Sequence, residues 1–529
     1  MNLIFKRASN SIPFLLGLTL GLYFITFNIV GITLTYFPGD FGDGRFNNYI
    51  LEHAYRFFTG QADSFWNAPF MYPEPDVLSY SDNLLGTAPV YSFFRFIGCD
   101  RETAFQWWFI FMAVLSYTCT YFFLKDVFKN RYAAVVGAMV FAFSMALQSQ
   151  MTHAQTFPRF PIPLAFWMAY LFILDFKPRF FFLTLFFVVY QYYCGIYLGL
   201  LLIIPISVML LLGFVFYRDI LIEKMNKEWI ITITSFFTIN ILLSLPLLIP
   251  YIQRAQAVES NSFSYIFQTI PHFKSFIFSQ SGSLLWNFLS GIGSAFPAWW
   301  DHQLFAGSLA TLSVLIFSAV VIMRFIKSDS FPDQISDNRI VIMFITGLVT
   351  FFLFVRVSNF SFYRIIHALP GYDSLRSLTR VINIELIFFA FATAFVVKWV
   401  FSKSRIRPGI LFLGIIALFI LDNYYKDGKS YRSEKRLSQE RIEELVIKMQ
   451  NIPKGSIVSY EPTEVGSRSV ELQLDAMLAA QSLNLKTVNG YSATSPGTYT
   501  DFWFRMDSVS RQKWFKAKEL SVDMLYVIR

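Results

Sequence analysis

Two aspartates stand close together in the stretch FPGDFGDGRFNNYILEH, residues 37–53. Asp40 and Asp43 are three residues apart, and Gly42 and Gly44 flank the second of them. A carboxylate in such a place can take a proton from a hydroxyl group, bind a cation together with a second carboxylate, or cap a helix. An EF-hand calcium loop is excluded, because glycines occupy the positions of its oxygen ligands. A general base and a helix cap stay open as alternatives for Asp43.

Cationic and imidazole side chains that suit the same chemistry occur in other polar stretches. The segment PGYDSLRSLTR, residues 370–380, places Arg376 and Arg380 four residues apart, on one face if it is helical. Arginine matches the oxygens of a phosphate group, and its alternative role here is to reach lipid head groups. His153, in SQMTHAQTF, can bind a substrate or a metal, or serve as a structural hydrogen-bonding group.

Three more side chains are candidates for substrate binding. Arg45 follows the two aspartates directly, His53 lies on the apolar stripe of the next helix, and Asp301 stands at the outer end of an apolar segment. The alternative for His53 is packing inside the protein. Further polar residues of the same loops rank below these three: Tyr72, Asp82, Arg254, His302 and Arg364.

The elements that must position these residues are strongly apolar. The chain has 529 residues, of which 55% are hydrophobic and 15% charged, and its mean hydropathy is +0.47. Soluble proteins carry about 25% charged residues, so the composition predicts an integral membrane protein. The net charge of +9 lies mostly in short loops, where it reports membrane orientation and not a nucleic-acid partner. The three cysteines show no metal-binding or disulfide spacing.

About eleven apolar segments are candidates for membrane spans, since a span needs about 20 apolar residues. With Lys6 and Arg7 in the cytoplasm, alternate connections are short and basic, and three long loops fall outside: 37–102, 251–304 and 358–379. The sequence therefore predicts a multi-pass protein of the plasma (inner) membrane with a cytoplasmic N-terminus. The candidate segments are 12–36, 103–124, 132–149, 160–175, 180–195, 196–216, 229–250, 305–325, 339–357, 380–400 and 407–422.

Two polar regions have a pattern of their own. In the first outer loop, apolar residues from Phe46 to Phe58 recur at helical spacing, which predicts an amphipathic helix along the membrane surface or packed on the bundle. In the tail, LSQERIEELVIKM reads as an amphipathic helix, and 456–460 and 524–528 read as short strands. The predicted domains are a membrane domain, 1–422, and a small extracytoplasmic α/β module, 423–529.

A first span followed by a long outer loop with an aspartate pair and an interfacial helix resembles the GT-C superfamily of membrane glycosyltransferases. This superfamily includes the protein O-mannosyltransferases and the bacterial aminoarabinose transferase. Further stretches are similar to bacterial members: MYPEPDVLSYSDNLLGTAPVY (71–91), QMTHAQTFPRFPIPLAFW (150–167), WWDHQLFAG (299–307), PGYDSLRSLTR (370–380) and VNGYSATSPGTY (488–499). The resemblance implies a GT-C-like helical bundle and inverting transfer of a sugar from a polyprenyl-phosphate carrier on the outer face.

The resemblance also implies roles for residues. The catalytic carboxylate of such enzymes lies in the first outer loop, which points to Asp43, with Asp40 as the alternative or as a partner in binding a divalent cation, Mg or Mn. Partial burial is expected to raise the pKa of Asp43 and strengthen it as a base. The acceptor is a lipid, a polysaccharide or a protein. By resemblance alone, Asn489, Tyr491 and Ser492 bring the tail over the site.

Two other classes of function remain open. A membrane transporter or lipid flippase usually carries ionisable or broken positions in mid-span. Most spans here are bare, and Glu385 is a rare acid inside one. The polar chemistry gathers in the outer loops, which favours catalysis at the outer face. A scaffold protein is the third alternative, in which the loop acids have only structural roles.

Overall fold

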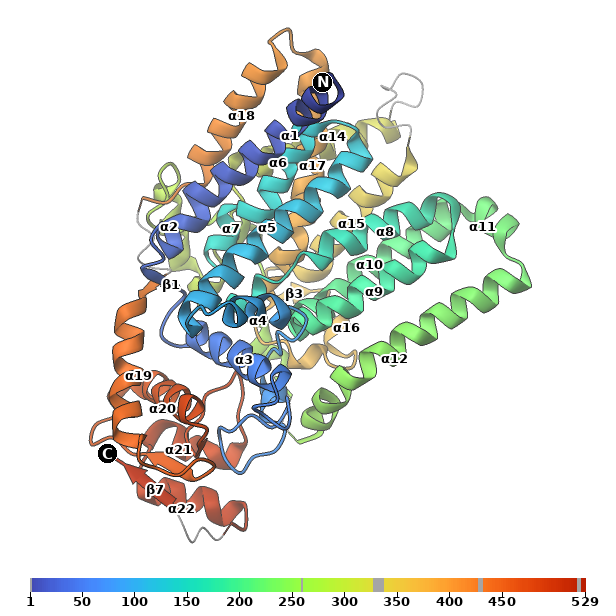
Figure 1. Ribbon diagram of the computed structural model, residues 1–529. Helices are drawn as coiled ribbons and strands as arrows, with labels where there is room; N and C mark the ends of the chain where they lie inside the picture. The colour runs from blue at the N-terminus through green and yellow to red at the C-terminus, as the bar shows by residue number, and fades with distance from the viewer. Residues whose placement is uncertain (1, 258–259, 327–336, 427–431, 521–524) are drawn as a thin grey trace.

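The computed structural model describes residues 2–257, 260–326, 337–426, 432–520 and 525–529. Figure 1 shows a bundle of long helices that is followed, at one end, by a second packed region made of α3, α4 and the tail. The two termini lie at opposite ends of the molecule (Figure 1). The candidate site lies where the first long loop and the tail meet.

In the described residues, seven helical segments are long and apolar enough to cross a membrane, and three more apolar helices are shorter. This makes the chain a polytopic helical protein, while the number of eleven spans stays a prediction. The long segments are α1 (Asn2–Gly21) with η1 (Leu22–Thr26) and α2 (Phe27–Val30), α5 (Arg101–Phe128), α6 (Arg131–Phe143) with α7 (Met145–Gln148), η3 (Ala154–Thr156) with α8 (Pro161–Asp175), α10 (Ile196–Phe216), α12 (Lys227–Ala257), and η9 (Leu378–Val381) with α17 (Ile382–Lys403). The shorter ones are α14 (Ser308–Ile326), α15 (Asn338–Phe354) and α18 (Pro408–Asn423).

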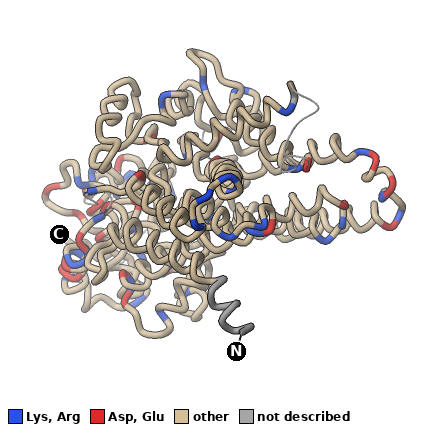
Figure 2. Tube along the Cα trace, turned by 90° about the horizontal axis from the view of Figure 1, so that it is seen from above, with Lys and Arg blue, Asp and Glu red and all other residues tan. Residues whose placement is uncertain are grey.

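Connecting elements complete the bundle. The helix α9 (Pro178–Cys194) is separated from α10 by Gly195 alone, where the sequence predicts a hairpin turn. The outer loops contain η2 (Val77–Tyr80), α13 (Phe263–Phe267), η4 (Phe273–Ile277), η5 (Asn287–Ala295), η6 (Trp299–Asp301), the hairpin β2 (Arg356–Val357) and β3 (Phe360–Ser361), α16 (Tyr363–His367) and η8 (Tyr372–Ser374). Figure 2 shows mostly uncharged chain, with charged residues gathered in the tail and at the tip formed by α11 (Arg218–Lys224).

The tail builds a small three-stranded parallel sheet, β6–β5–β7, packed with helices. Its elements are β4 (Arg432–Glu434), α19 (Lys435–Met449), β5 (Ile457–Tyr460), η11 (Gly466–Arg468), α20 (Ser469–Leu483), β6 (Lys486–Thr487), η12 (Gly497–Tyr499), α21 (Thr500–Arg505), α22 (Ser508–Ala517) and β7 (Leu525–Ile528). Of the predicted strands, 456–460 contains β5, and 524–528 contains β7, although residue 524 lies outside the described residues.

The tail and the first outer loop share one hydrophobic core. Phe37, Tyr49 and Trp108 belong to the same buried cluster as Leu474 and Trp514 of the tail. The membrane helices form a separate, larger cluster. The strand β1 (Tyr36–Pro38) also pairs antiparallel with β4, with Phe37 opposite Ser433. The tail is therefore packed against the first outer loop, and the division into domains at residue 422 stays a prediction.

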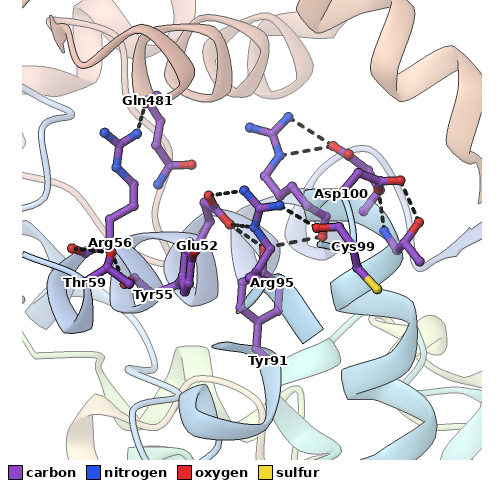
Figure 3. Close-up of polar contacts among 12 residues, drawn as sticks. Glu52, Tyr55, Arg56, Thr59, Tyr91, Arg95, Cys99, Asp100 and Gln481 are labelled. Carbon is purple, nitrogen blue, oxygen red and sulfur yellow. Dashed lines mark hydrogen bonds and ion pairs between the residues drawn. The ribbon is translucent and has the colours of Figure 1, made fainter. Parts of the chain in front are cut away.

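The helix that follows the aspartates, α3 (Asp43–Phe58), is covered on both sides and does not lie free along a membrane surface. It packs between α4 (Ala88–Phe96) and α5 on one side and α20 on the other (Figure 1). Its polar face is buried because it meets polar partners. Glu52 accepts hydrogen bonds from Tyr91 (2.7 Å) and from Nε of Arg95 (2.8 Å), and Arg56 donates to the backbone of Gln481 in α20 (Figure 3).

Candidate active site

The turn before α3 separates the roles of the two aspartates. Oδ1 of Asp40 accepts the backbone N–H of Gly42 (3.1 Å) and that of Gly44 (3.5 Å). Gly42 is the N-cap of α3, and Asp43 is the first residue inside the helix and makes no capping bond. A Cβ on Gly44 would lie 2.9 Å from the carbonyl oxygen of Pro38, so the turn requires glycine there. The helix-cap alternative for Asp43 is therefore wrong, and Asp40 stabilises the turn.

The carboxylate of Asp43 is held by two side chains from distant parts of the chain. Nδ1 of His153 lies 2.7 Å from Oδ2, and the hydroxyl of Tyr491 donates to Oδ1 over 2.5 Å. Since an ionised carboxylate only accepts hydrogen bonds, Nδ1 of His153 carries a proton. The Asp43 and His153 side chains keep 18% and 24% of their exposure, so both are accessible at the surface of the site.

Local packing brings His153 to this position. His153 directly precedes η3, and Gln155 in η3 accepts a hydrogen bond of 2.8 Å from the side-chain amide of Asn47 in α3. Asn47 also donates to the backbone oxygen of Asp43 over 2.7 Å. One asparagine thus fixes the histidine segment against the helix turn that carries the aspartate.

The electrostatics of the two aspartates differ from what the sequence indicates. Burial opposes the charge of Asp43, but the hydrogen bond and charge of His153, the Tyr491 hydroxyl and the charge of Arg380 outweigh it and lower the pKa of Asp43. The predicted rise in the pKa of Asp43 is wrong, because it follows from burial alone and leaves out these partners. Burial and the nearby charge of Asp43 instead raise the pKa of Asp40. Asp43 therefore keeps its charge to lower pH than Asp40 does.

Arg380 is the cation that faces Asp43. Its side chain is 5% exposed, and its buried Nε has no hydrogen-bond partner among the described residues. The guanidinium lies 4.8 Å from the ring centre of Tyr197. Burial raises the pKa of Asp82, and the charge of Arg380 offsets part of that rise. Asp82 accepts the backbone N–H of Tyr197 at 3.2 Å, at the start of α10. A buried arginine with unused donors is a binding group for an anion.

The remaining candidates lie at different places. Arg376 donates from Nη1 to the backbone oxygen of Ala493 in the tail, over 3.1 Å. Nε2 of His53 lies 3.0 Å from the backbone oxygens of residues 64 and 65. Burial lowers the pKa of His53 to about 4. His53 is therefore a packed, neutral histidine. Asp301 lies in η6 and His302 packs beside it, with Nδ1 2.9 Å from the hydroxyl of Ser275.

Arg45 connects α3 to the tail. Its Nη1 lies 2.6 Å from Oδ1 of Asp475 in α20, and both side chains are buried. Asp475 also pairs with Arg441, at 2.7 Å. The arginine that follows the aspartates in sequence therefore has a structural partner, two residues from Asp43 on the same helical turn.

This ion pair gives a prediction for stability. We expect Arg45→Met to lower the free energy of unfolding by about 1–3 kcal/mol, because Asp475 loses the buried one of its two charged partners. Thermal unfolding in detergent measures the change. Arg436→Met is the matched control, since the Arg436 side chain is 88% exposed and its ion pair with Glu440 adds little. Equal melting temperatures for the two variants would show that the buried pair contributes nothing.

Two members of this cluster carry only a weak signal in the sequence. Asp82 looked like one of many solvated loop acids, and no local pattern distinguishes it. Tyr491 entered only through a family resemblance, because it lies 448 residues from its partner Asp43. Periodicity and spacing report neighbours within one element, and they do not pair residues from opposite ends of a chain.

The described residues do not fit a metal site built from three protein ligands. No group of three His, Cys, Asp or Glu side chains among them lies close enough together to hold an ion. Both oxygens of Asp43 are engaged by Tyr491 and His153, and Oδ1 of Asp40 faces backbone N–H groups. No step of the chemistry is therefore assigned to Mg or Mn.

Comparison with known proteins gives similarity at the level of structure. No family model and no curated protein matches the chain. The crystal structure of the oligosaccharyltransferase from Archaeoglobus fulgidus aligns with 92% of this chain and 65% of its own length, with a TM-score of 0.49 and 11% identity. The cryo-EM structure of the arabinofuranosyltransferase AftD from Mycobacteria aligns with 85% of this chain and 29% of its own, with a TM-score of 0.46 and 12% identity.

A further structure of the archaeal protein, AglB, holds an inhibitory peptide and a dolichol-phosphate, and aligns with a TM-score of 0.47 and 11% identity. This alignment again covers 92% of this chain and 65% of the archaeal chain. The chain therefore spans less than two thirds of the length of these neighbours. The two neighbours are an oligosaccharyltransferase and an arabinofuranosyltransferase.

Proposed function

We propose that this protein transfers a sugar from a polyprenyl-phosphate donor to a hydroxyl group of a cell-envelope acceptor, at the outer face of the membrane and with inversion. The observation that carries the proposal is the placement of the Asp43 carboxylate, held by His153 and Tyr491, where the charge of the buried Arg380 acts on it. The carboxylate suits the proton of an acceptor hydroxyl, and the cation suits the phosphate of a leaving group.

In this reaction the acceptor oxygen forms a bond with C1 of the sugar while the bond from C1 to the phosphate oxygen breaks. The electron pair of that bond leaves with the polyprenyl phosphate, and Asp43 takes the proton of the acceptor hydroxyl. The lowered pKa keeps Asp43 in the form that can accept a proton, although it makes the carboxylate a weaker base. Phosphate is a good leaving group, so the reaction needs no general acid.

The place of Arg380 supports a lipid-linked donor. Arg380 lies in η9, and the chain continues directly into the membrane helix α17. An apolar cavity of about 350 Å³ lies between α14, α15 and α17 and includes Glu385, five residues beyond Arg380. Five residues of helix rise about 7.5 Å. A donor whose phosphate binds at Arg380 can therefore place its isoprenoid chain in this cavity. Without a donor, membrane lipids would fill the cavity.

The test is transfer by the purified protein in detergent or liposomes. Labelled polyprenyl-phosphate sugars are offered together with lipid, polysaccharide and peptide acceptors taken from the cell envelope. We expect a labelled product with wild-type protein and none with Asp43→Asn. Movement of the labelled donor across a liposome membrane without any product would instead support the transporter or flippase alternative. Comparison of envelope glycans with and without the protein then identifies the acceptor.

A further inference from the structure

The segment 489–494 of the tail lies across the candidate site. Tyr491 reaches the carboxylate of Asp43, and two residues later the backbone oxygen of Ala493 accepts a hydrogen bond from Arg376. Thr494 donates to the backbone oxygen of Tyr80 over 3.2 Å. One short stretch thus contacts the aspartate turn, the arginine loop and the first outer loop.

This segment is fixed on its other side as well. The backbone N–H of Gly490 donates to the side-chain oxygen of Gln473 over 3.0 Å, and a Cβ on Gly490 would lie 2.2 Å from Cγ of Met71. The ring of Tyr491 packs edge-on against Phe46 of α3, with ring centres 5.4 Å apart. A side chain held in this way can hold its partner in one orientation, because its own freedom is already lost.

The surroundings of Tyr491 keep its hydroxyl protonated, so that it can donate a hydrogen bond. Burial and the charge of Asp43 raise the pKa of the Tyr491 hydroxyl, so it stays protonated and donates to the carboxylate. The other groups that face Asp43 are His153 and Arg380, which stabilise its charge, and Asp40 and Asp82, which oppose it. Tyr491 is the only one of the three stabilising groups that comes from the tail.

We infer that Tyr491 is a positioning residue for the transfer reaction proposed above, on which this inference rests: its hydroxyl holds the Asp43 carboxylate ionised and aimed at the acceptor. The tail then contributes a side chain to the active site. Tyr491 itself takes no proton from the substrate. Its hydroxyl keeps one oxygen of Asp43 engaged, and the remaining lone pairs stay available to the acceptor.

The test removes only the hydroxyl. In Tyr491→Phe we expect kcat to fall by about tenfold with little change in KM, since a hydrogen bond to a charged group is lost. Loss of this donor raises the pKa of Asp43, so the acid limb of the pH profile moves to higher pH. Tyr499→Phe is the control, because Tyr499 is a fully buried tyrosine of the tail that donates to the backbone oxygen of Val488 over 2.8 Å and does not contact Asp43.

A second measurement does not depend on activity. Infrared difference spectra follow the carboxylate band that Asp43→Asn removes, and we expect this band to titrate at higher pH in Tyr491→Phe than in wild type or Tyr499→Phe. A shifted band in a protein that transfers no sugar would support the positioning role and contradict the proposed function. A transferring enzyme in which Tyr491→Phe matches Tyr499→Phe in both measurements, or is faster than wild type, would overturn the inference.

Discussion

Replacing Asp43 with asparagine is expected to lower the rate of sugar transfer by about 10²–10⁴-fold, the usual contribution of a general base. The amide has the same size but cannot take up the proton of the acceptor hydroxyl. Initial rates at saturating donor and acceptor measure the effect. Binding of the polyprenyl-phosphate donor is expected to persist, because Arg380 and the apolar cavity are unchanged.

The matched control for this prediction is Asp40→Asn. Asp40 lies before the helix, and its contacts are with the backbone of the turn. An asparagine oxygen can accept the same N–H groups, so this variant is expected to keep most of the activity. The opposite ranking, with Asp40→Asn inactive and Asp43→Asn active, would make Asp40 the base. Similar melting temperatures of the two variants would exclude unfolding as the cause.

Replacing Arg380 with alanine is expected to have an effect of similar size, about 10²–10³-fold in kcat. Negative charge grows on the phosphate as its bond to the sugar breaks, and a buried cation stabilises that charge more than a solvated one does. The variant also leaves Asp43 and Asp82 without their shared counter-charge. Kinetics with a polyprenyl-phosphate sugar check the prediction.

Two further variants show which property of Arg380 matters. Arg380→Lys keeps the charge but loses the planar fork, and we expect it to recover only part of the activity. Arg376→Ala is expected to raise the KM for the donor and to leave kcat closer to wild type, because Arg376 contacts Ala493 and lies farther into the surface loop. A larger loss of kcat in Arg376→Ala than in Arg380→Ala would move the phosphate site to Arg376.

The sequence predicted the parts of the fold that depend on local pattern. Apolar runs of sufficient length indicated the membrane helices, and the stripe from Phe46 to Phe58 indicated α3 to within a few residues. The acidic start of the first loop pointed to Asp43, with Asp40 as the alternative, and the spacing of the arginines pointed to Arg376 and Arg380 together; the roles of these residues stay predictions. Each of these signals lies within one element, where composition and periodicity carry the information.

What the sequence missed depends on contacts between distant segments. A lone amphipathic stripe does not reveal that Glu52 and Arg56 on the polar face meet α4 and α20. The pKa of Asp43 was expected to rise because its partners, His153 and Tyr491, could not be assigned. The helix cap stayed an alternative for Asp43 because an aspartate before a helix has the right chemistry for it, and only the turn geometry places Gly42 at the N-cap.

The pairing of β1 with β4 has a consequence for the order of events during synthesis. The strand just before the aspartates finds its partner only when residues 432–434 have been made, and Tyr491 follows later still. A ribosome-bound chain therefore carries Asp43 for most of its synthesis without the contact from Tyr491. The site is completed only after the last hundred or so residues have been made and have folded against the first loop.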